Sequence, residues 1–163
     1  MRRFLIALAL TLVMAVPAQA ADVSKLQLPG DLTTAQAQKV LAGALAFAEK
    51  QGVPMNIAIV DAGGNLKAFV RMDGAFLGSI DVSMKKAKTA RMFNMSTATM
   101  GAASQPNQEL YGIEVTNNGL VIFGGGELLV DKAGVIIGAI GVSGGSVQED
   151  TNVAQAGVAA LNN

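Results

Sequence analysis

The sequence predicts an α+β fold in which helices flank a five-stranded antiparallel sheet. Two apolar runs, residues 119–130 and 135–142, flank a four-residue turn at 131–134, which is typical of a β-hairpin. A second hairpin is predicted over residues 55–71. Helical patterns precede, separate and follow the two hairpins. Groups of strands beside groups of helices favour an antiparallel sheet covered by helices.

The first helix is predicted to begin after Thr33, which acts as N-cap with Gln36 in the reciprocal position of a capping box. Apolar residues then recur at helical spacing over 37–48. Gly52 and Pro54 are expected to end this helix, because glycine favours the left-handed cap and proline prevents continuation.

Two strands follow, at 55–60 and 66–71, and the second helix is predicted over 79–93. A short helical turn is expected at 97–103, and residues 119–142 are expected to supply the third, fourth and fifth strands. The residues predicted to form the buried face of the second helix are Ile80, Met84, Ala87 and Ala90.

The run from 135 to 142 is almost wholly apolar and rich in β-branched residues, so it is predicted to be a central strand buried on both faces. Gly138 and Gly141 interrupt this run. Because glycine weakens a strand, the sequence leaves three explanations open: a helix that packs closely, a bend, or a ligand against the backbone.

The last helix is predicted over 146–161, with Ser146 and Glu149 forming a capping box. The preceding Gly144 and Gly145 expose backbone N–H groups at the positive end of this helix, so these three residues, Gly144 to Ser146, are candidates for binding an anion. The alternative is that the glycines only make the turn tight.

The N-terminal segment has the pattern of a secretory signal peptide. A basic start, an apolar stretch at 4–16 and a small-residue cleavage site at 18–20 predict a signal peptide over residues 1–20. A polar leader at 21–30 and a single domain at 31–163 follow. The apolar stretch is too short for a stable membrane span. We therefore expect a periplasmic or secreted protein.

Composition excludes several functions. The chain has no histidine and no cysteine, which excludes serine–histidine and cysteine–histidine catalysis and argues against zinc. Without the first twenty residues, ten basic residues stand against twelve acidic ones, a net charge of −2. No strongly basic surface is available for nucleic acid.

The cations of the chain are concentrated on the predicted second helix. Lys85, Lys88 and Arg91 recur every three residues, Lys86 lies beside them, and Arg71 is near in sequence. This basic edge predicts a binding surface for an anionic ligand. The alternative is an ordinary solvated helix face.

Several motifs together resemble the GlcG/HbpS family. They are, in order, residues 56–64 (NIAIVDAGG), 71–75 (RMDGA), 111–117 (YGIEVTN), 123–126 (FGGG) and 138–145 (GAIGVSGG). The resemblance spans about residues 31–161. It implies a profilin-like layout of the five-stranded sheet, homo-oligomers and, in some members, haem binding by an extracellular protein. Other members are domains or neighbours of glycolate and corrinoid enzymes.

Haem is the cofactor that this resemblance implies. Histidine, the usual axial ligand of haem iron, is absent. The candidate axial ligands are Met72, Met92, Tyr111 and Thr116. The alternative for the methionines is aliphatic packing or a flexible interface. The haem propionates would lie near Lys88, Arg91 or Arg71.

Two functional hypotheses follow. The first is an exported, non-enzymatic binding protein for haem or a related tetrapyrrole, which also associates with itself. The second is an enzyme or enzyme accessory acting on a small carboxylate such as a hydroxy acid, gripped by Arg71 and the Gly145–Ser146 helix start. No catalytic constellation supports the second hypothesis. The carboxylates Asp61, Asp73, Glu114 and Asp150 are isolated in sequence and are interpreted as turn, cap or surface residues.

Overall fold

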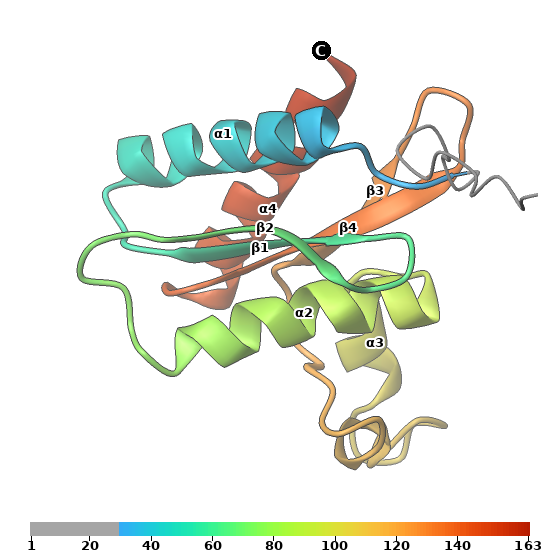
Figure 1. Ribbon diagram of the computed structural model, residues 1–163. Coiled ribbons are helices and arrows are strands. Elements are labelled where there is room, and N and C mark those ends of the chain that lie inside the picture. The colour runs from blue at the N-terminus through green and yellow to red at the C-terminus, as the bar shows by residue number, and fades with distance from the viewer. Residues whose placement is uncertain (1–29) are drawn as a thin grey trace, which may run out of the picture.

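The computed structural model describes residues 30–163 (Figure 1). The predicted signal peptide and nearly all of the polar leader lie outside these described residues. The elements, in chain order, are α1 (Thr34–Gln51), β1 (Asn56–Asp61), β2 (Leu66–Arg71), α2 (Ser79–Phe93), α3 (Thr97–Ala103), the 3-10 turn η2 (Ile113–Val115), β3 (Gly126–Val130), β4 (Ile136–Ser143) and α4 (Val147–Asn162).

The predicted α+β class is confirmed, and the sheet is antiparallel throughout with strand order β2-β1-β4-β3. Helices α1 and α4 cover one face and α2 covers the other (Figure 1). Strand β1 alternates accordingly: Ile57 and Ile59 pack toward α1 and α4, whereas Ala58 and Val60 pack toward α2. The prediction that residues 135–142 form a central strand is confirmed, since β4 has a partner strand on each side.

Both predicted hairpins form, and the same turn closes each of them. In the first, the Asp61 carboxylate accepts hydrogen bonds from the backbone N–H groups of Gly63 and Asn65, both at 2.9 Å. Asp131 accepts equivalent bonds from the N–H groups two and four residues later, also at 2.9 Å. Asp61 is therefore a turn residue, as predicted.

The sheet has four strands within the described residues, so the prediction of a fifth strand is wrong. The missing strand was expected at the start of the 119–130 run, where Gly119 and Gly125 adopt positive φ values of 93° and 109° that interrupt extended pairing. Helices hold this segment instead. The Val121 N–H donates to the buried Thr89 hydroxyl of α2 at 3.1 Å, and the Ile122 carbonyl lies against Gly101 of α3.

The predicted helix boundaries are confirmed by cap geometry. Thr33 and Gln36 form the capping box of α1, and Gly52 ends it in the left-handed conformation with φ of 75°. Ser146 and Glu149 form the capping box of α4. Within residues 30–163, no helix combines the length and apolar character needed to cross a membrane.

The glycine in the middle of β4 marks a close helix contact. A Cβ atom on Gly141 would collide with the backbone carbonyl of Ser83 and the backbone nitrogen of Ala87, both on α2. Of the three explanations that the sequence left open for this glycine, the closely packed helix is the one observed. The contact brings α2 down onto the sheet and sets which of its residues remain accessible.

Candidate functional site

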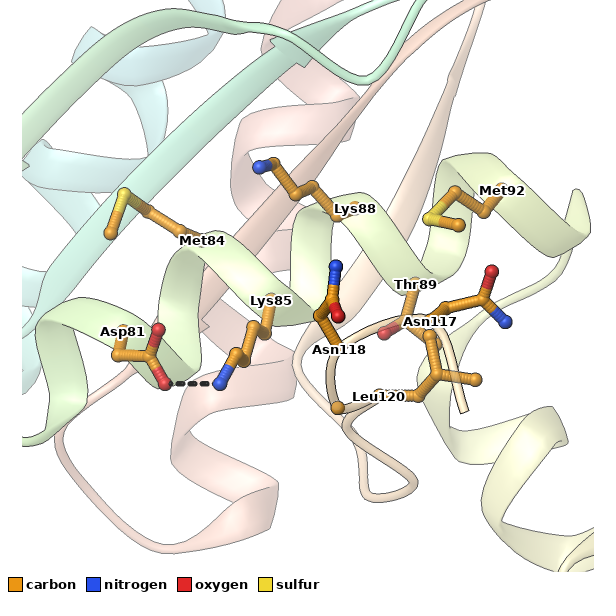
Figure 2. A pocket seen from close by; sticks show the side chains of 10 residues that line it. Asp81, Met84, Lys85, Lys88, Thr89, Met92, Asn117, Asn118 and Leu120 are labelled. Carbon is orange, nitrogen blue, oxygen red and sulfur yellow. Dashed lines mark ion pairs between the residues drawn. The ribbon is translucent and has the colours of Figure 1, made fainter. Parts of the chain in front are cut away.

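A cleft of about 340 Å³ lies between α2 and the loop that follows η2 (Figure 2). We call it the α2 cleft. Its lining residues are Asp81, Met84, Lys85, Lys88, Thr89 and Met92 from the helix and Asn117, Asn118, Gly119 and Leu120 from the loop. The loop can fold back over the helix because Asn117 and Asn118 adopt left-handed conformations, with φ of 52° and 60°.

The cleft combines cations with apolar side chains. Lys85 forms an ion pair with Asp81 at 2.8 Å and reaches the opposite wall, where a methyl group added to Gly119 would lie 3.5 Å from its Nζ. Lys88 leaves α2 in a different direction and is exposed (Figure 2). Met92, which is 49% exposed, adds a thioether to the cleft. Such walls suit a ligand that has both an apolar body and an acidic group.

The structure separates the other predicted cations from this cleft. Arg91 donates to the Asn94 side chain at 2.6 Å and is not among the lining residues. Arg71, at the end of β2, donates to the Ala75 carbonyl at 3.3 Å. The basic edge predicted from sequence therefore contributes two of its members, Lys85 and Lys88, to the cleft.

Lys86 does not belong to the basic edge, because it is completely buried. Its Nζ donates to the Asp150 carboxylate at 2.7 Å and to the Val142 carbonyl at 2.8 Å, and it lies 4.7 Å from the centre of the Phe123 ring. Burial lowers the pKa of Lys86, and the hydrogen bond and charge of Asp150 oppose this shift.

Asp150 is correspondingly not an isolated carboxylate, which corrects the sequence interpretation. It is 2% exposed and joins the start of α4 to the middle of α2. One sequence signal could have revealed that Lys86 is buried: it lies three residues after Ser83 and four before Ala90, on the stripe of α2 that faces the sheet.

The N–H groups at the start of α4 already have acceptors from the chain itself. Gly145 donates to Asp150 at 3.0 Å, and the Ser146 N–H donates to Glu149 at 2.8 Å. The Ser146 hydroxyl donates to Glu149 as well, and the two bonds from Ser146 lower the pKa of Glu149. Gly144 is required for close packing, since a Cβ there would collide with the Pro54 carbonyl. Anion binding at Gly144, Gly145 and Ser146 thus stays a prediction, and an anion would have to displace these carboxylates.

The four predicted axial ligands lie in different environments. Met92 lines the cleft, and Thr116 precedes Asn117 of its wall, where its hydroxyl donates to the Ile113 carbonyl. Tyr111 is 67% exposed on the same excursion of the chain. Met72 packs against the larger core cluster, and its sulfur accepts from the Met55 N–H. Among residues 30–163, no group of three acidic side chains is placed to hold a metal ion.

Residues 32–159 match the family model described as "Haem degrading protein HbpS-like". The chain belongs to the HbpS-like family. It is 39% identical over 132 residues to a 15.0 kDa protein from the dhaT–dhaS intergenic region of Citrobacter freundii, covering 81% of this chain and 93% of that protein. It is also 39% identical over 115 residues to the corrinoid adenosyltransferase PduO of the same organism. That match covers 71% of this chain but only 34% of PduO.

Solved structures agree with this assignment. A PduOC–haem complex superposes with a TM-score of 0.75 at 35% identity, covering 80% of this HbpS-like chain and 94% of that one. A double mutant of HbpS from Streptomyces reticuli superposes with a TM-score of 0.77 at 30% identity, covering 92% and 99% of the two chains. The α+β fold of the family is thus shared over nearly the whole of these neighbours.

Proposed function

We propose that this protein is an exported, non-enzymatic binding protein whose ligand is haem or a related tetrapyrrole. The similar PduOC chain solved with haem is the observation that carries the proposal. The α2 cleft supplies a second support, because it places amines beside thioethers and other apolar side chains. Haem has the matching combination of an apolar ring, two acidic propionates and an iron atom.

The cleft residues fit one edge of such a ligand. A volume of about 340 Å³ lies at the lower end of the range for small-molecule sites, so the cleft accepts the acidic edge while the rest of the ring lies outside it. Lys88 and Lys85 are placed to hold propionates. Met92, or Thr116 and Tyr111 on the neighbouring excursion, would supply an axial ligand in place of histidine.

Titration of the purified protein with haemin, followed by its Soret absorption, tests this proposal. Replacing both Lys85 and Lys88, the two lysines that line the cleft, by alanine should weaken binding several-fold without unfolding the protein, since exposed charge pairs contribute ~0–1 kcal/mol each. The matched control replaces Lys39 and Lys50, two exposed lysines of α1. The Soret band should differ from that of bis-histidine haem. Unchanged haemin affinity in the variant of the basic edge would mean that this edge is only a solvated helix face.

A second candidate function is an enzyme or enzyme accessory that acts on a small carboxylate such as a hydroxy acid. Its support is the similarity to part of the enzyme PduO. Arg71 is the residue proposed to grip the carboxylate. A thermal-shift screen of small hydroxy acids, repeated on Arg71→Gln, decides between the candidates. Stabilisation by a hydroxy acid together with absent haemin binding would favour this second function.

Export is part of the main proposal and has its own measurement. The mature chain should begin at Ala21 and be recovered from the periplasm or the medium. Intact-mass analysis of the exported protein reads this directly. A product that retains residues 1–20 and sediments with membranes would contradict export by signal-peptide cleavage.

A further inference from the structure

We infer that Asp81 sets the charge selectivity of the α2 cleft. It occupies Lys85, so the cleft is matched to one acidic group of a ligand, and a second acidic group binds only by replacing Asp81 on Lys85. The inference rests on the proposed function, because it assumes that the α2 cleft holds the acidic edge of the ligand. It identifies the residue that limits how many acidic groups of the ligand the cleft can bind.

The positions of the three charged residues lead to this inference. Asp81 and Lys85 lie one helical turn apart and both line the cleft, joined at 2.8 Å. In the part of the chain that the structure describes, no ion pair holds Lys88. Figure 2 shows Lys85 directed toward Asp81 and Lys88 directed elsewhere. The lining therefore carries a net charge of about +1, with its available cation at Lys88.

The Asp81–Lys85 pair is open to exchange. The Lys85 side chain is 37% exposed and that of Asp81 is 63% exposed, so water screens their attraction and the pair is weak. A ligand carboxylate can replace Asp81 at Lys85 for little more than the loss of that exposed pair. Asp81 would then remain beside the incoming carboxylate as an unfavourable like charge. Both effects act against a second acidic group and leave the first unaffected.

Two probes that differ by one acidic group separate these effects. Haemin carries two free propionates, and its monomethyl ester carries one. Asp81→Asn should tighten haemin binding about two- to fivefold, the size of one exposed charge interaction. It should change binding of the monomethyl ester by less than about twofold. Adding Lys85→Gln to Asp81→Asn should remove the gain for haemin.

Asp73→Asn is the matched control, because Asp73 is an exposed carboxylate that does not line the cleft. It changes the net charge by the same amount and should alter neither affinity. Equal effects of Asp81→Asn and Asp73→Asn, or equal effects on the two probes, would overturn the selectivity role while leaving haem binding intact. If the unaltered protein binds neither probe saturably, the proposed function fails and this inference falls with it.

Discussion

Replacing Gly141 by valine should severely destabilise the protein. Even a Cβ atom at this position would overlap the Ser83 carbonyl oxygen and the Ala87 nitrogen and lie 3.1 Å from the Ala87 Cα. All three atoms belong to the backbone of α2, so no side-chain rotation relieves the contact. The helix would have to withdraw by roughly 1 Å or more to restore van der Waals distances. That shift would separate it from both central strands.

The cost can be estimated from related substitutions. Overpacking a core costs typically 1–3 kcal/mol, and a collision with backbone belongs at ~3 kcal/mol or above, out of a total stability of about 5–15 kcal/mol. Urea titration at pH 7 should show this loss. Gly78→Val is the control, because nothing lies within 4 Å of a Cβ at Gly78 and its φ of −64° is ordinary. A midpoint for Gly141→Val equal to that of the parent would refute the close helix contact.

Three further outcomes are expected. Lys86→Met should lower the free energy of unfolding by about 3–5 kcal/mol, because it leaves Asp150 charged and buried. The double variant Lys86→Met/Asp150→Leu should recover part of this loss in urea titration. No recovery of stability would contradict the pairing argument. Burial raises the pKa of Glu127 above its ordinary 4.5, so the folded state favours the protonated side chain. This contribution to the free energy of unfolding is present below pH 4.5 and is lost as pH rises through the folded-state pKa. Glu127→Gln should therefore be more stable than the parent at pH 7 and equal to it at pH 4. Light scattering at micromolar concentration should give a homo-oligomer mass, since only 15% of residues are charged against a usual ~25%, and a monomer mass would refute it.

Local rules were sufficient for most of the fold. Helix caps depend on residues three apart in sequence, so the boxes at Thr33 and Ser146 could be located without tertiary information. The Asp61 and Asp131 turns are equally local, since each carboxylate bonds N–H groups two to four residues away. The apolar run of β4 indicated its central position, because a strand buried on both faces shows no alternation of polar and apolar residues.

The expected third strand failed because its partner is not a strand. Leu120 and Val121 are buried, as a strand pattern requires, but they pack on α2 and not in the sheet. Periodicity reports burial and does not report what covers a residue. The α2 cleft could not be predicted from the sequence for a related reason. Its second wall, residues 117–120, lies about thirty residues from α2 in sequence, and only the tertiary fold brings the two together.

Helix α2 shows how one short sequence can serve two opposite environments. Residues advance about 100° around a helix, so Lys86 turns inward with the stripe that faces the sheet while Lys85 and Lys88 lie at the border of the cleft. The spacing alone could have placed Lys86 inside, but its partner Asp150 is 64 residues away and no local pattern connects them. A buried ammonium is tolerated only where its acceptors are, at Asp150 and the Val142 carbonyl. The pair and the close contact at Gly141 together hold α2 in one rotation about its own axis, and that rotation decides which two lysines border the cleft.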